Sequence, residues 1–162
     1  MADVPIYVAA ITAAAGIIGA LIPQAAIMMR DVQQAERDRR ERSATAMRDA
    51  CVELMRTAGE LRTLAESIRS YRGDANGMRA RVEEVRNHAE ATRLHAASVG
   101  MLAPDRLAEP ADKVAVAARS LADDVVRNTD LDRGVPIGFA DTSAMDACIA
   151  AFRNEAVNYA GE

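Results

Sequence analysis

Apolar side chains recur in a heptad rhythm along four stretches of the chain. Each stretch steps alternately by four and three residues, which gathers these positions on one helix face. Breaks rich in glycine, proline, asparagine or aspartate separate the stretches, at 73–77, 100–104 and 129–141. The positions are Met47, Cys51, Leu54, Ala58, Leu61, Ala65 and Ile68; Met78, Val82, Val85, Ala89, Thr92, Ala96 and Val99; Leu107, Ala111, Val114, Ala118, Leu121 and Val125; and Met145, Ile149, Phe152, Ala156 and Tyr159. Four such stretches predict an all-α fold with an antiparallel four-helix bundle over residues 47–162.

Two other helical architectures fit the same pattern less well. One is a three-helix bundle with a loose tail, and the other is a pair of long hairpins completed only in a dimer. Ser143 followed by Asp146 indicates a capping box at the start of the last helix. Gly59, in the middle of the first stretch, is expected to mark a close approach between helices.

The chain before the first stretch is different in kind. Val4 to Met29 contains no charged side chain, and about 20 apolar helical residues suffice to span a bilayer core. Residues 1–29 are therefore predicted to form a transmembrane anchor in contact with membrane lipid. Pro23 should kink or end the regular helix near Ile22. Polar residues 30–46 are expected to continue as a helical stalk.

The flanks of this segment predict its orientation. Five arginines follow it within thirteen positions, and no lysine or arginine precedes it. They are Arg30, Arg37, Arg39, Arg40 and Arg42. Because cytoplasmic flanks collect basic residues, we expect a single-pass protein of the plasma or inner membrane, with its N-terminus outside and its bundle in the cytoplasm. A cleaved secretory signal would need a basic start and a shorter apolar stretch. A buried core helix would not explain the one-sided arginines.

Small residues in the anchor indicate self-association. Thr12, Gly16 and Ala20 are four residues apart, a spacing that lets two membrane helices pack closely. A segment this rich in alanine also produces the spacing by chance. We nevertheless expect a homo-oligomer that packs through these three residues.

Composition narrows the classes of function. The net charge is −4 with the two signs interspersed, which argues against a nucleic-acid-binding surface. The chain has no tryptophan and only two phenylalanines, so its core must be built from aliphatic residues and methionine. Cys51 and Cys148 should be buried free thiols in a reducing cytoplasm, whereas in a secreted bundle they could pair.

The longest break, residues 129–141, carries the candidate binding site. Val135, Ile137 and Phe139 alternate in a segment that ought to be polar. They either fold back to close the end of the bundle or form an exposed docking site for a cytoplasmic protein partner. The three aspartates there are spaced partly as in a calcium loop, but the glycine is displaced and the final glutamate is missing, so turn and cap roles are preferred. They are Asp130, Asp132 and Asp141.

No pattern in the chain indicates catalysis, a metal or another cofactor. His88 and His95 share a helix face with Glu84, but the paired glutamate–histidine motifs of di-iron bundles are missing. Neither cysteine has a histidine close in sequence, and there is no glycine-rich phosphate loop and no nucleophile elbow. The chain is therefore not expected to be an enzyme.

The run RRERSATAMRDACVELMRTAGELR behind the alanine-rich anchor resembles small single-pass membrane proteins of actinobacteria. The resemblance covers roughly residues 4–65 and implies no activity. Taken together, the sequence predicts a membrane-anchored helical bundle that acts by protein–protein binding, as a scaffold or recruitment module. The alternative is a small pore-forming effector, although an anchor with few polar residues besides Thr12 and Gln24 would line a water-filled pore poorly.

Overall fold

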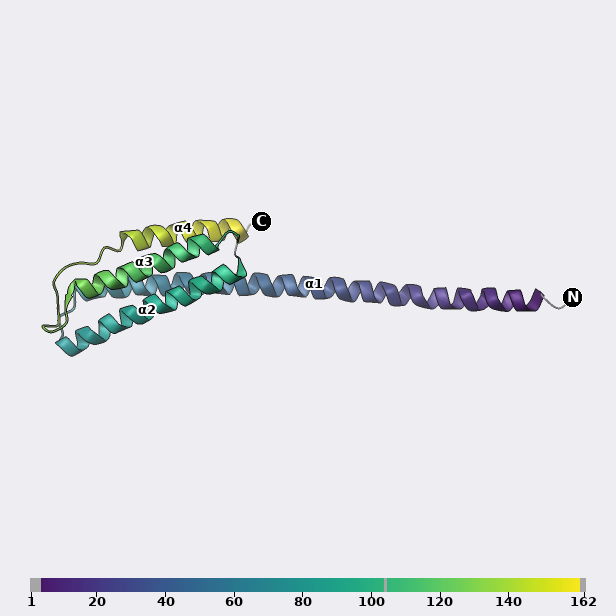
Figure 1. The fold of residues 1–162 in the computed structure, drawn as a ribbon, viewed down its shortest axis with the longest axis horizontal. Coiled ribbons are helices and arrows are strands. Elements are labelled where there is room, and N and C mark those ends of the chain that lie inside the picture. Colours follow the sequence, from purple (N-terminus) through teal and green to yellow (C-terminus); the bar gives the residue numbers. More distant parts are fainter. Residues whose placement is uncertain (1–3, 104, 161–162) are drawn as a thin grey trace. The chain divides into compact units, whose positions relative to one another are not determined.

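The computed structural model describes the backbone of residues 4–103 and 105–160, and the side chains of residues 29–103 and 105–159. The chain divides into two units, residues 1–44 and 45–162. The described residues form four helices and one short hairpin (Figure 1), which confirms the all-α class. The elements are α1 (Val4–Arg69), α2 (Ala75–Leu102), α3 (Ala108–Arg127), β1 (Thr129–Asp130), β2 (Val135–Pro136) and α4 (Ser143–Ala160).

The first unit is the N-terminal part of α1. The helix does not end near Ile22 as predicted but continues through Pro23. Side chains from 29 to 44 are exposed, except for the half-buried Asp38, whose carboxylate accepts a hydrogen bond from Gln34 at 3.0 Å. Among the side chains that the structure describes, no helical segment is long and apolar enough to cross a bilayer. The anchor prediction for residues 1–29 lies outside them, apart from Met29.

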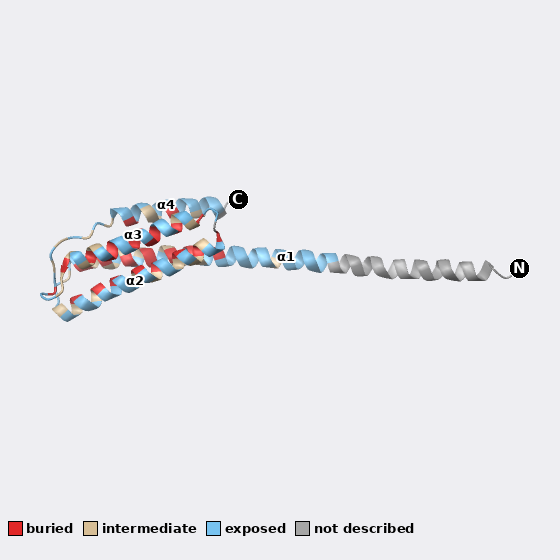
Figure 2. Ribbon diagram, viewed as in Figure 1, coloured by how far each residue is buried: buried red, intermediate tan, exposed pale blue. Residues whose placement is uncertain are grey.

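The second unit is a bundle of residues 45–69 of α1 with α2, α3 and α4. Successive helices run antiparallel, and their inward faces meet in a shared apolar core (Figures 1 and 2). Every heptad position predicted for the first three helices is buried. Helix α3 adds Ala115, Ala117 and Ala122 to this core. Small side chains at these positions let the helices approach closely and fill the space without aromatic residues.

Helix α4 follows its predicted pattern less completely. Met145 and Phe152 are each 1% exposed, but Ile149 and Ala156 are only half-buried and Tyr159 is 38% exposed. The heptad spacing thus identifies the inward face of the helix but not how deeply that face packs. On the same helix Cys148 is half-buried, whereas Cys51 in α1 is buried, and both thiols are free.

Side chains at the helix starts differ from the prediction in one place. Helix α2 is capped by Asp74, whose carboxylate accepts the Gly77 N–H at 2.8 Å. Helix α4 is instead preceded by Asp141, whose carboxylate accepts the Ser143 N–H at 2.9 Å. The expected Ser143–Asp146 capping box is therefore wrong. The Asp146 carboxylate lies 2.6 Å from Arg62 Nε and joins α4 to α1 instead.

Candidate functional site

The connection between α3 and α4 is a β-hairpin at one end of the bundle. Strand β1 pairs antiparallel with β2, with Thr129 opposite Pro136 and Asp130 opposite Val135. Gly134 has a positive φ of 68° and donates its N–H to the Asp130 carbonyl at 2.8 Å. The Asp130 carboxylate accepts two further backbone N–H groups, each at 3.0 Å, from Asp132 and Arg133. A glycine in the left-handed region is typical of such tight connections, so the spacing of Asp130 and Gly134 is a signal that the sequence analysis missed.

This hairpin is fixed against the bundle at several points. Gly134 sits so close to α2 that an added Cβ would lie 2.5 Å from the Ala75 backbone nitrogen. The Asn128 carbonyl accepts the Ile137 N–H at 2.9 Å, and Leu131 and Ala140 pack against the buried core. The hairpin therefore presents its outward side chains from a supported backbone.

The three predicted binding residues are exposed on this hairpin. The exposed fractions are 43% for Val135, 66% for Ile137 and 64% for Phe139. They do not close the end of the bundle, because Leu131 and Ala140 make the contacts with the core instead. The Arg69 guanidinium at the end of α1 lies 4.2 Å from the centre of the Phe139 ring, within the range of a cation–π contact.

A small cavity opens beside Phe139. Its volume is about 240 Å³, and its buried apolar lining comes from Ala65, Ile68 and Val125. The exposed side chains of Arg69 and Phe139 also line it. Asp141 lies on the same connection, where the N–H of Ser143 holds the pKa of the Asp141 carboxyl below its usual value. The cavity thus has apolar side chains and the buried Thr129 at its base, and polar groups, a cation and an aromatic ring among its walls.

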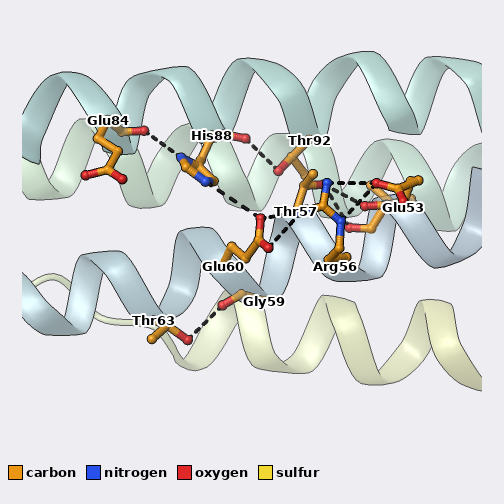
Figure 3. A network of polar contacts seen from close by, with 10 residues as sticks. Glu53, Arg56, Thr57, Gly59, Glu60, Thr63, Glu84, His88 and Thr92 are labelled. Atoms are coloured by element: carbon orange, nitrogen blue, oxygen red, sulfur yellow. Dashed lines mark hydrogen bonds and ion pairs between the residues drawn. The ribbon is translucent and has the colours of Figure 1, made fainter.

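A second candidate region is the polar network between α1 and α2, shown in Figure 3. The Glu84 carbonyl accepts a hydrogen bond from His88 Nδ1–H at 2.9 Å, and His88 Nε2 lies 3.7 Å from a Glu60 oxygen. Arg56 donates to Glu60 at 2.7 Å and to Glu53 at 2.8 Å. The hydrogen bonds from Arg56 hold the pKa of Glu53 below its usual value. Both Arg56 ion pairs lie within α1, and the contact between His88 and Glu60 joins this cluster to α2.

The groove over this network corrects the expectation for Gly59. Nothing lies within 4 Å of the position where a Cβ would be, so the glycine does not mark a close helix approach. Gly59 is half-buried and lines this groove together with Thr63, whose hydroxyl donates to the Gly59 carbonyl at 2.9 Å (Figure 3). The sequence pattern could not distinguish an open groove from a tight contact, because glycine suits both.

The remaining predicted residues are dispersed. The aspartates considered for calcium serve as turn and cap residues or, for Asp132, in an ion pair with Arg79 at 3.5 Å. Within residues 29–103 and 105–159, no three histidine, cysteine or acidic side chains lie close enough to hold a metal ion. The anchor residues Thr12, Gly16 and Ala20 lie outside the described side chains.

Comparison of the chain with protein-family models, with curated proteins and with solved structures gave no match. Conclusions about function therefore depend on the chemistry of the chain itself. Of the regions described here, the hairpin combines exposed apolar side chains with an adjoining cavity, and the α1–α2 groove is lined by side chains that already pair with one another.

Proposed function

We propose that this chain is a single-pass membrane protein whose helical bundle binds a protein partner in the cytoplasm through Val135, Ile137 and Phe139. The observation that carries the proposal is the exposure of these three side chains on a hairpin whose backbone is held against the bundle. Exposed apolar side chains that cluster on a supported surface mark interaction sites, and aromatic residues often supply much of the binding energy there. The protein acts by binding and not by catalysis.

The membrane part of the proposal is supported by the sequence of residues 4–29. Their lack of charge and the five arginines that follow favour an anchor with its N-terminus outside. Helix α1 runs from Val4 to Arg69 and so contains both this segment and the first helix of the bundle. The proposed oligomer forms within the membrane through Thr12, Gly16 and Ala20.

The binding test compares two sets of substitutions of equal size. In the first, Val135, Ile137 and Phe139 are replaced by serine. In the control, serine replaces three apolar residues of similar exposure outside the hairpin, Val52, Val116 and Val157, which are 50%, 62% and 66% exposed. Partners found by proximity labelling with the parent protein are produced in purified form, and their affinity for each variant is measured by interferometry.

The proposal requires that the hairpin variant loses a partner that the control variant retains, with unchanged circular dichroism and thermal midpoint in both. A partner that binds the hairpin variant as tightly as the parent protein would refute the docking role. Equal loss in both variants would also count against it, because the effect would then not be specific to the hairpin.

The anchor is tested separately. After carbonate extraction the full chain should remain in the membrane fraction, and a C-terminal tag should be digested by protease only after the membrane is opened. Gly16→Ile should reduce cross-linked oligomers without releasing the chain from the membrane, because a bulky side chain prevents close helix packing. Release of trapped dye from liposomes by the purified chain would instead favour a pore-forming effector.

A further inference from the structure

The cavity beside Phe139 is of a size that suits one side chain. Its volume of about 240 Å³ is below the roughly 300–1,000 Å³ of typical small-molecule sites. Its buried side chains are the apolar Ala65, Ile68 and Val125 together with Thr129, whose hydroxyl already donates to the Val125 carbonyl at 2.7 Å. The exposed Phe139 also lines the cavity. A bulky apolar side chain of another protein would be removed from water on entering this cavity and would also contact Phe139.

Two arginines around this cavity form no ion pair with a carboxylate in the described part of the chain. Within the described residues, Arg69 forms no ion pair with a carboxylate and contacts the Phe139 ring instead. Arg72, in the adjoining turn, donates to the Tyr71 carbonyl at 2.9 Å and likewise forms no ion pair there. Glu66, the acidic residue among the lining side chains, lies 3.1 Å from Arg62, which it shares with Asp146.

The other acidic groups at this end of the bundle are already engaged. Asp130 binds backbone N–H groups of the hairpin, Asp141 caps α4, and Asp132 lies 3.5 Å from Arg79. An incoming carboxylate would therefore meet Arg69 at the cavity and Arg72 in the adjoining turn, neither of which is paired with a carboxylate in the described residues. A uniformly anionic surface such as a bilayer would also meet the exposed carboxylates of Asp132 and Asp141, which would oppose its approach.

Building on the proposed function, we propose that the hairpin surface recognises a linear segment of its protein partner in which carboxylates flank one bulky apolar side chain. The apolar side chain enters the cavity beside Phe139, and a neighbouring carboxylate pairs with Arg69. Arg72 adds to the attraction at longer range. The cavity thus determines which side chain is accepted, and the two arginines determine the charge of its neighbours.

Three fluorescent peptides test this proposal on the purified full chain in detergent. The first carries one phenylalanine flanked by aspartates, the second has alanine in place of phenylalanine, and the third has lysines in place of aspartates. Fluorescence anisotropy should show binding of the first peptide at least about tenfold tighter than that of the other two, and raised salt should weaken it. Equal affinity for all three would overturn the proposal.

Charge reversal tests whether Arg69 is the arginine that binds the carboxylate of the peptide. Arg69→Glu should weaken binding of the aspartate peptide about tenfold or more and strengthen binding of the lysine peptide. Arg119 is an exposed arginine of α3, and Arg119→Glu should leave the affinity for both peptides unchanged. Phe139→Ser should weaken the aspartate peptide, and circular dichroism confirms folding of each variant. An equal effect of Arg119→Glu would show that net charge alone acts, and competition by anionic vesicles would point to lipid as the occupant; both outcomes refute the proposal.

The two proposals fail in different ways. If the serine variant of the hairpin loses its partner but the peptides show no preference, docking stands and the acidic–apolar recognition is wrong. If the serine variant keeps its partner, the docking site itself is wrong, whatever the peptides do.

Discussion

The first three helical segments of the bundle and α4 are packed to different depths. Residues 47–68, 78–99 and 107–125 bury every position of their apolar faces, whereas α4 buries only Met145 and Phe152 below one-tenth exposure. Phe152 is the one aromatic side chain among the residues that α4 buries. Most of α4 is exposed or half-buried in Figure 2. Elements with few buried contacts open locally at lower free energy than the rest of a domain. The difference indicates that α4 is the element most easily released.

This difference matters for the hairpin because α4 begins directly after it. The hairpin is held to α2 through Gly134, to the core through Leu131 and Ala140, and to α3 through Asn128. None of these contacts depends on the second half of α4. We therefore expect the exposed hairpin side chains to keep their arrangement when the end of α4 frays.

The largest expected effect comes from removing the aromatic ring of α4. Phe152→Ala should lower the free energy of unfolding by about 3–5 kcal/mol, since it removes a buried ring and leaves a cavity. Leu61→Ala, at a position that is 0% exposed in α1, should cost about 2–5 kcal/mol. Hydrogen exchange should distinguish the two variants. Phe152→Ala should accelerate exchange in α4 selectively, and Leu61→Ala should accelerate exchange in all helices.

Val157→Ala is the matched control for α4, because this residue is 66% exposed. Its free energy of unfolding, from urea titration, should stay within about 0.5 kcal/mol of the parent value. Equal acceleration of all four helices in Phe152→Ala would contradict the difference between α4 and the rest of the bundle.

The reactivity of the two thiols measures the difference in packing between α4 and α1 without any substitution in the core. Cys148 on the weakly packed α4 should react with N-ethylmaleimide at least about tenfold faster than Cys51, which is 7% exposed in α1. Burial also raises the pKa of Cys51, so its reactive thiolate is scarcer at neutral pH. Unfolding frees this thiol to ionise, so stability should fall as the pH rises above about 8.5.

Mass spectrometry after short pulses of the reagent measures both rates. In denaturant the two thiols should react alike, which excludes an intrinsic difference in reactivity. Faster or equal labelling of Cys51 in the folded protein would show that α1 opens as readily as α4.

The helical faces were predictable from sequence because burial repeats with the period of the helix. Spacing alone places Leu54, Val85 and Val114 in the core, and all three are buried. Depth was not predictable: Ile149 has the same pattern and is only half-buried. Periodicity describes one helix, whereas depth depends on how far its neighbours extend beside it.

The candidate site was predictable in part. Alternation in the sequence identified Val135, Ile137 and Phe139, but not the contact between Phe139 and Arg69. These two residues are 70 positions apart, and nothing local to either indicates the other. The cavity is likewise formed by α1, α3 and the hairpin together, so it exists only once the bundle has assembled.

A substitution at Gly59 has the smallest expected effect, and it tests the packing of α1 against that of α4. Because no atom lies within 4 Å of the added methyl group, Gly59→Ala should stabilise the bundle by about 0.5–1 kcal/mol through helix propensity alone. The gain should appear in urea unfolding and in the exchange of α1, while labelling of Cys148 through opening of α4 stays unchanged. Gly134→Ala is the opposite control: its positive φ and the Ala75 backbone at 2.5 Å leave no room for a methyl group, so stability should fall. A loss of stability in Gly59→Ala would show that the groove over α1 closes in solution, and α1 would then pack against a surface that the open groove does not provide.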